Sequence, residues 1–81
     1  MRVRVRLFAQ LRDLAGTGDV ALEVPDAANV QAVWQALVSA HPVLAPFEAS
    51  VSSAVNAEYA KRHAMVSAGD EVAFLPPVSG G

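Results

Sequence analysis

The sequence predicts an α+β fold in which one main helix lies across one face of a mixed sheet of four or five strands. Three observations predict it: strict alternation of apolar and polar residues in 2–8 and 19–24, one longer stretch of apolar residues at three-and-four spacing, and further short strand-like segments in the second half. When one helix accompanies several strands, it usually packs on one face of their sheet. The 81 residues correspond to one domain, and 53% hydrophobic against 17% charged residues is typical of a compact globule.

The first strand is predicted at residues 2–8. Its apolar side chains point to one face and its charged side chains to the other, which we interpret as a solvated sheet face: Val3, Val5 and Leu7 against Arg2, Arg4 and Arg6. Residues 8–15 then predict a helix of about two turns. Its inward stripe is expected to consist of Phe8, Leu11, Leu14 and Ala15. Gly16 is expected to end this helix in the left-handed conformation.

The second strand is predicted at residues 19–24 and ends at Pro25. Asn29 is a suitable N-cap for the main helix, and Pro42 ends that helix near His41 because proline disfavours helical backbone at the preceding residue. The spacing of the apolar residues places them in the core: Val30, Val33, Trp34, Leu37 and Val38.

The second half of the chain predicts shorter elements. Residues 43–50 are interpreted as a loop with room for one helical turn, and 51–57 as a strand. Residues 58–62 predict a turn and another short strand, and 67–70 a turn. The last strand is expected at 71–75, where two prolines stop it.

Composition excludes several classes of function. Six Lys and Arg against eight Asp and Glu give a net charge of −2, so we expect no nucleic-acid partner. The absence of cysteine excludes disulfides, thiolate metal sites and a cysteine nucleophile. No apolar run is long enough for a signal peptide or a membrane span, so we expect a cytoplasmic protein that does not insert into membranes.

Side chains for self-contained catalysis are not apparent. Neither His41 nor His63 has a partner at zinc-helix spacing, so we expect no metal site. Asp70 and Glu71 are neighbours on a strand and point to opposite faces, which prevents them from sharing a proton. We therefore do not expect this chain to carry out chemistry through its side chains.

The C-terminal end is the unusual feature, and we divide the chain into a domain at 1–76 and a tail at 77–81. Pro76 and Pro77 fix the backbone and would direct the tail outward as a stiff stem. Residues 76–81 reach about 20 Å when extended. Gly80 and Gly81 have no side chain, so the end of the chain can enter a narrow channel and present a carboxylate there. A carboxylate needs activation, for example as an acyl-adenylate, and this predicts a protein substrate that passes between enzymes.

Three segments together resemble one family. Leu7–Gly16 is similar to the opening, Ala54–Tyr59 to the central segment, and Gly69–Gly81 to the ending of molybdopterin synthase small subunits, which are ubiquitin-like sulfur carriers. The resemblance implies the ubiquitin-like β-grasp fold, with the first and last strands as parallel neighbours at the sheet centre. It also implies that the chain binds no cofactor and that catalytic residues lie on the large subunit.

The resemblance further implies a reaction sequence. A ubiquitin-activating-like adenylyltransferase would use ATP to adenylate Gly81, and a cysteine desulfurase pathway would supply the sulfur for a thiocarboxylate. The tail would then enter the large synthase subunit and give its sulfur to cyclic pyranopterin monophosphate. The family assembly is a heterotetramer of two small and two large subunits.

The resemblance also assigns roles to residues. Gly81 would carry the sulfur. Gly80, which has no side chain, would let the tail pass through a narrow channel. The stem would comprise Pro76, Pro77, Val78 and Ser79. The family's hydrophobic docking patch matches Phe8, Tyr59 and Leu75, for which core packing is the alternative; relatives often have an aromatic residue where Leu75 stands. Arg12 would meet an acidic patch on the activating enzyme, or would simply lie on a solvated helix face.

Three other functions remain open. The chain could be a sulfur carrier for thiamine synthesis or tRNA thiolation, although thiamine carriers are typically shorter and lack the opening segment. It could be a protein modifier that is conjugated to lysines through Gly81. It could also be an interaction module with an idle tail, in which case removal of Gly81 would leave its function intact.

Overall fold

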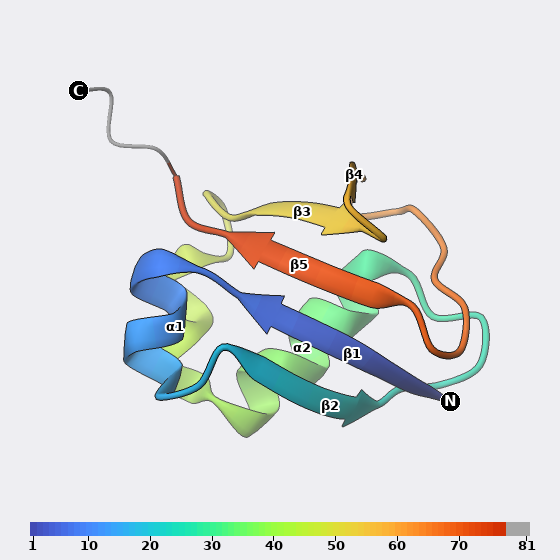
Figure 1. Cartoon of the computed structure of the whole chain (residues 1–81), viewed down its shortest axis with the longest axis horizontal. Coiled ribbons are helices and arrows are strands. Elements are labelled where there is room, and N and C mark those ends of the chain that lie inside the picture. Colours follow the sequence, from blue (N-terminus) through green and yellow to red (C-terminus); the bar gives the residue numbers. More distant parts are fainter. Residues whose placement is uncertain (78–81) are drawn as a thin grey trace.

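The structure is a computed structural model that describes residues 1–77. Figure 1 shows a twisted sheet with helical segments packed beside it. In chain order the elements are β1 (Arg2–Leu7), α1 (Ala9–Ala15), β2 (Asp19–Glu23), α2 (Val30–Ala40), the 3₁₀ helix η1 (Pro42–Phe47), β3 (Ser52–Val55), β4 (Glu58–Tyr59) and β5 (Glu71–Leu75).

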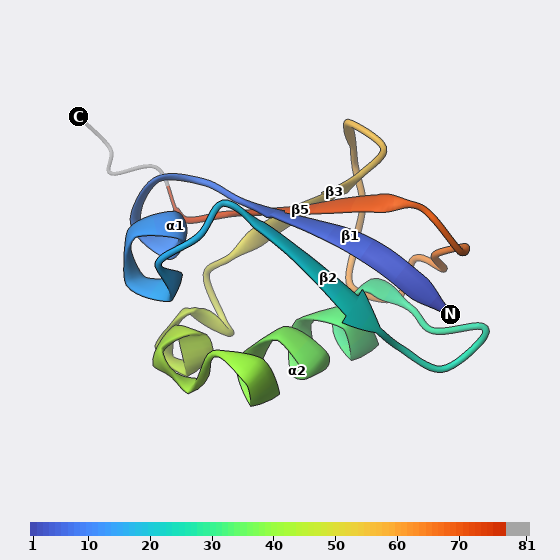
Figure 2. The same cartoon turned by 60° about the horizontal axis from the view of Figure 1, so that its bottom comes forward.

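The five strands form one mixed sheet in the order β2-β1-β5-β3-β4. β1 and β5 are parallel neighbours at its centre, although most of the chain separates them, and the other pairs are antiparallel. α2 lies across one face of the sheet, as Figure 2 shows. The predicted α+β class is confirmed, and the arrangement is that of the ubiquitin-like β-grasp.

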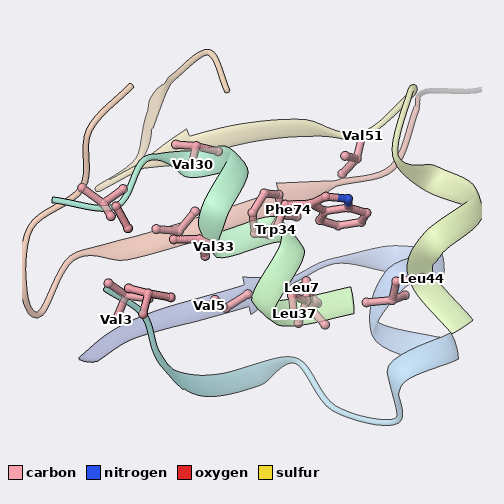
Figure 3. Close-up of a cluster of buried hydrophobic side chains, with 14 of the residues drawn as sticks. Val3, Val5, Leu7, Val30, Val33, Trp34, Leu37, Leu44, Val51 and Phe74 are labelled. Atoms are coloured by element: carbon pink, nitrogen blue, oxygen red, sulfur yellow. The ribbon is translucent and has the colours of Figure 1, made fainter. Parts of the chain in front are cut away.

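The core lies between α2 and the sheet. Val33, Trp34 and Leu37 of α2 are fully buried against the inward side chains of β1 and β5, which Figure 3 shows in close-up. The rings of Trp34 and Phe74 meet edge to face, with centroids 5.0 Å apart and an interplanar angle of 61°. The alternation in β1 is confirmed because its inward residues are at most 2% exposed.

Local sequence signals mark both ends of α2 and the C-terminal end of α1. The side chain of Asn29 accepts a hydrogen bond from the backbone N–H of Ala32 at 2.9 Å, as an N-cap should. α2 ends at Ala40 with His41 as its C-cap, and Pro42 opens η1. Gly16 caps α1 with φ = 79°, which confirms its left-handed conformation.

The inward stripe predicted for residues 8–15 is confirmed for Leu11 and Ala15 and is wrong for Phe8 and Leu14. α1 begins at Ala9 and buries only Leu11, whereas Phe8 is 38% and Leu14 is 41% exposed. Phe8 still has extended backbone, so it follows the alternation of β1, in which Leu7 takes the inward position. In α1, Leu11 is therefore the buried core residue and Ala15 packs partly buried against the core.

Two boundaries in the second half also differ from the prediction. The strand expected at 51–57 spans only Ser52–Val55, because Asn56 and Ala57 form the turn to β4 with φ of 50° and 71°. The segment 43–50, interpreted as a loop with a helical turn, contains the six-residue helix η1.

Candidate functional site: the outer sheet face and the root of the tail

The face of the sheet that α2 does not cover carries a row of apolar residues. Tyr59 pairs with Ala54, Ala54 with Ala73, and Ala73 with Arg6, so these side chains share one face. Leu75 lies two residues beyond Ala73 on β5 and pairs with Ser52. Phe8 follows the Leu7–Phe74 pair by one residue, so extending the parallel register places it next to Leu75. We define the outer apolar face as Phe8, Ala54, Tyr59, Ala73 and Leu75.

The structure thus places three residues that are far apart in sequence on one face of the sheet. Tyr59 is 85% and Phe8 is 38% exposed, so core packing is excluded for both, and Leu75 is half-buried. Exposed aromatic side chains beside other apolar residues are typical of contact surfaces. Their role in docking stays a prediction that the geometry permits.

Phe8 is held outward by the turn from β1 into α1. Ala9 adopts φ = 50°, a left-handed conformation that is unusual for alanine. The Phe8 carbonyl accepts the backbone N–H of Leu11 at 3.1 Å, which starts α1 directly after it. The guanidinium of Arg6 lies over the Phe8 ring, 5.5 Å from its centroid, and connects the outer apolar face to the charged part of the sheet.

Tyr59 is positioned by Asn56, a residue that sequence analysis did not single out. The Asn56 backbone N–H donates to the Glu71 carbonyl at 2.8 Å, and its side-chain oxygen accepts from the Glu71 N–H at 3.0 Å. Its side-chain nitrogen donates to Asp70 Oδ1 at 3.1 Å. These bonds fasten the β3–β4 hairpin to the start of β5. The only sequence signal for Asn56 was its place inside the matched central segment.

The arginines of β1 form ion pairs across the sheet. Arg2 Nε lies 3.1 Å from Glu23, and Arg6 lies 3.6 Å from Asp19 and 3.5 Å from Glu71. Among residues 1–77, Arg6 Nε is a buried polar atom without a hydrogen-bond partner. The interpretation of a charged, solvated face is confirmed for Arg2 and Arg4, which are exposed, while Arg6 is half-buried.

Arg12 does not join the outer apolar face. Its exposed side chain runs across the turn between α1 and β2, where a Cβ on Gly18 would lie 2.9 Å from Arg12 Cδ. Nothing in the structure tests its predicted contact with an activating enzyme.

The tail begins at the edge of the outer apolar face. β5 ends at Leu75, and Pro76 is half-buried whereas Pro77 is exposed. Val78, Ser79, Gly80 and Gly81 lie outside the described residues, so their predicted roles, and the tail as a separate segment, stay predictions. Leu75 is the last residue before the stem and is also part of the outer apolar face. The root of the tail therefore lies at the outer apolar face.

A second polar cluster lies near the helical side of the molecule. Arg62 donates hydrogen bonds to Glu48 Oε2 at 2.8 Å and to Gln31 Oε1 at 2.6 Å, and its guanidinium lies 5.6 Å from the centroid of the Trp34 ring. The hydrogen bond from Arg62, followed by that from Gln31, lowers the pKa of Glu48 below its usual range. The cluster ties the segment after β4 to α2 and to the end of η1.

Residues 1–77 hold neither a candidate metal site nor a membrane-spanning helix. They contain no group of three or more His, Cys, Asp or Glu side chains that could hold a metal ion. No helix among them has both the length and the apolar character needed to cross a membrane.

Comparisons with known proteins agree with the geometry. A family model described as the ThiS family matches residues 5–81. The molybdopterin synthase sulfur carrier subunit of Arabidopsis thaliana is 37% identical over 81 residues, covering 100% of this chain and 84% of that protein. Small archaeal modifier protein 1 of Haloferax volcanii is 37% identical over 84 residues, covering 94% of this chain and 97% of that protein.

Solved structures give the same result for the fold. The crystal structure of SAMP1 from Haloferax volcanii superposes with a TM-score of 0.91 at 35% identity and covers 100% of both chains. The family resemblance is therefore confirmed over the whole chain rather than at its motifs alone. With its sheet order, its outer apolar face and these matches, the chain belongs to the ThiS family of ubiquitin-like β-grasp proteins.

Proposed function

We propose that this chain is the sulfur carrier subunit of a molybdopterin synthase. One observation supports the proposal most: the central strand β5 ends at Leu75 beside an exposed apolar face, and the chain continues from there to Gly80 and Gly81. The relative from Arabidopsis thaliana bears this name at 37% identity. A carrier protein that docks through one face while its C-terminus reacts elsewhere needs both an exposed apolar face and a slender C-terminal end.

The reaction takes place at the Gly81 carboxyl group. Its carboxylate oxygen attacks the α-phosphate of ATP on an adenylyltransferase, which forms an acyl-adenylate and releases pyrophosphate. The terminal sulfur of a persulfide from a cysteine desulfurase pathway then attacks the acyl carbon and displaces AMP. A thiol cleaves the S–S bond of the resulting acyl disulfide, which releases the thiocarboxylate and leaves a disulfide. The thiocarboxylate sulfur attacks cyclic pyranopterin monophosphate in the large subunit and forms a C–S bond. Water then hydrolyses the thioester that joins the two molecules, which leaves the sulfur on the pterin and restores the Gly81 carboxylate. Two such transfers supply the sulfurs of the dithiolene. This chain supplies the acyl group and its delivery, while the partners supply activation and catalysis.

The outer apolar face docks on the large subunit. Phe8 and Leu75 lie next to the root of the tail, so burying them fixes where the stem leaves the interface. Residues 76–81 then extend about 20 Å into the partner. Burial of aromatic anchors at the centre of an interface commonly dominates its affinity. In the family assembly, two such contacts join two small subunits to a central pair of large subunits.

Mass spectrometry of the intact chain tests this proposal. After incubation with the adenylyltransferase, ATP and a sulfur donor, the chain should gain about 16 Da, as sulfur replaces oxygen in an activated acyl group. A chain without Gly81 should bind the large subunit normally but deliver no sulfur to the pterin. An unchanged mass in a competent system, or sulfur delivery by the shortened chain, would refute the proposal.

Protein modification is a second candidate, which one comparison favours. The relative from Haloferax volcanii at 37% identity is named as a modifier protein. Higher-mass conjugates that disappear when Gly80 and Gly81 are deleted would support this activity. Copurification separates the remaining sulfur-carrier alternatives, because a thiazole synthase in place of a molybdopterin synthase large subunit would indicate thiamine synthesis.

A further inference from the structure

Lys61 is the only lysine of the chain, although the sequence has five arginines. Its side chain is exposed, and no hydrogen bond or ion pair within residues 1–77 holds its ammonium group. The amino group of Met1, by contrast, donates a hydrogen bond to the Val24 carbonyl at 2.7 Å and lies 3.4 Å from Asp26 Oδ1. The chain has no thiol. Within residues 1–77, Lys61 is therefore the amine without a bonded partner that could attack an activated carboxyl group.

A hollow of about 450 Å³ lies beside Lys61. One wall is the start of β3 with the residue before it, at 51–53, and the other is the segment 59–62. Val51, Tyr59 and Ala60 make much of this lining apolar, while Lys61 and Arg62 contribute positive charge. Arg62 is already bonded to Glu48 at 2.8 Å, so Lys61 is the cation free to meet an incoming carboxyl group. Such a hollow suits an extended peptide that has small side chains and a carboxyl end.

We propose that Lys61 is an acceptor site at which the activated C-terminus of a second copy of this chain forms an isopeptide bond. The incoming segment is 76–81, which has two prolines, two small or apolar residues and two glycines, and reaches about 20 Å. A chain's own tail leaves the sheet at Leu75, which pairs with Ser52 on the side of β3 opposite to β4. To reach Lys61 it would have to cross β3, and Pro76 and Pro77 restrict the backbone turn that this needs.

The chemistry balances without an oxidant or reductant. The lone pair of the unprotonated Lys61 Nζ attacks the carbonyl carbon of the Gly81 acyl-adenylate. A C–N bond forms, the C–O bond to AMP breaks, AMP leaves and a proton passes to solvent. ATP and the adenylyltransferase are those of the proposed function, on which this inference rests for the activation of Gly81. Conjugation and sulfur transfer then compete for the same intermediate.

The test uses a donor that needs no activating enzyme. The donor is the full chain with Lys61→Arg and with Gly81 prepared as a C-terminal alkyl thioester, so only the acceptor supplies an amine at position 61. The acceptors are three full chains with free carboxyl ends: the unaltered chain, Lys61→Arg, and Lys61→Arg combined with Arg12→Lys. The last acceptor keeps one exposed lysine but moves it to α1. Intact mass measures conjugation, and fragmentation locates the linkage.

The unaltered acceptor should form a conjugate linked through Lys61, and Lys61→Arg should form none there. The relocated lysine should react at least about tenfold more slowly, because a bound tail raises the effective concentration of the acyl group at position 61 only. Absence of a conjugate, or equal rates for Lys61 and the lysine at position 12, would overturn the inference. Failure of the proposed function would appear separately, as an absence of the sulfur mass gain with the activating enzyme.

Discussion

Tyr59 and Phe8 are large side chains that folding leaves in contact with water. Tyr59 pairs with Ala54 at one end of the outer apolar face, and Phe8 lies beside Leu75 at the other. Neither belongs to the core cluster, so core packing does not account for them. A docking role accounts for their exposure, and single substitutions separate docking from folding.

Tyr59→Ala should weaken binding to the molybdopterin synthase large subunit about tenfold or more, as truncation of an interface aromatic often does. Its free energy of unfolding should change by less than about 0.5 kcal/mol, because the side chain is 85% exposed. Titration calorimetry and urea unfolding measure the two effects. Leu14→Ala is the matched control, since Leu14 is 41% exposed but lies on α1. An equal loss of affinity in both variants would contradict docking through the outer apolar face.

Glu48 should make stability depend on pH. The hydrogen bond from Arg62 lowers the pKa of Glu48 in the folded state, so its stabilising effect is present above the unfolded-state pKa and is lost as pH falls through the folded-state pKa. In urea unfolding, the advantage of the unaltered chain over Glu48→Gln should therefore be largest near neutral pH and shrink below about pH 4. Glu58→Gln, on an exposed strand, controls for the loss of one charge. A constant difference between pH 7 and pH 3 would argue against the Arg62 contact.

In the turn of the β3–β4 hairpin, one of the two residues suits the backbone conformation and the other does not. Val55 and Glu58 close a two-residue turn in which Asn56 and Ala57 both have positive φ. Turns of this kind favour asparagine followed by glycine, because a Cβ is disfavoured in the left-handed region. Asn56 tolerates the left-handed conformation and also forms hydrogen bonds to the start of β5. Ala57 stands where glycine is favoured, so its left-handed backbone is strained. Tyr59 lies on this hairpin, so a rigid hairpin would hold Tyr59 in place for docking.

Ala57→Gly should raise the free energy of unfolding by about 0.5–1 kcal/mol, because relief of the left-handed strain exceeds the entropy that glycine adds to the unfolded chain. Ala21→Gly is the matched control, since Ala21 is also exposed but lies in the middle of β2. That control should lose about 0.5–1 kcal/mol. Urea unfolding followed by the fluorescence of Trp34 measures both, and destabilisation by Ala57→Gly would show that the turn is not strained.

The whole molecule depends on one core between α2 and the sheet. For 81 residues, total stability is expected to be roughly 4–12 kcal/mol. Phe74 is fully buried at the centre of the sheet and contacts the Trp34 ring. Its strand β5 is hydrogen-bonded to both β1 and β3. A cavity at this position therefore weakens the packing of both the sheet and α2.

Phe74→Ala should cost about 3–5 kcal/mol, which removes a large part of that margin. Trp34, the single tryptophan, reports the transition, which should move to much lower urea concentration or be already complete without denaturant. Phe47→Ala is the matched control, because Phe47 is only partly buried against the core. Equal losses in the two variants would mean that the Trp34–Phe74 contact is not central to stability.

Patterns that repeat within a few residues were predictable from sequence. Alternation identified the inward side of β1, three-and-four spacing identified the buried stripe of α2, and Asn29 and Pro42 marked its ends. Prediction failed where two periodicities overlap. Phe8 fitted a helical stripe with Leu11, yet it continues the strand alternation, and only the position of the first α1 hydrogen bond decides between the two.

The sequence by itself determined the strand faces, the main helix and the Gly80–Gly81 end, because each follows from local sterics and spacing. Only the tertiary structure decided that Phe8, Tyr59 and Leu75 share one surface beside the root of the tail. That surface depends on the register of β1 against β5 and of β3 against β5 and β4. Register between distant strands is set by how their side chains pack against α2, a long-range energy that no local pattern encodes.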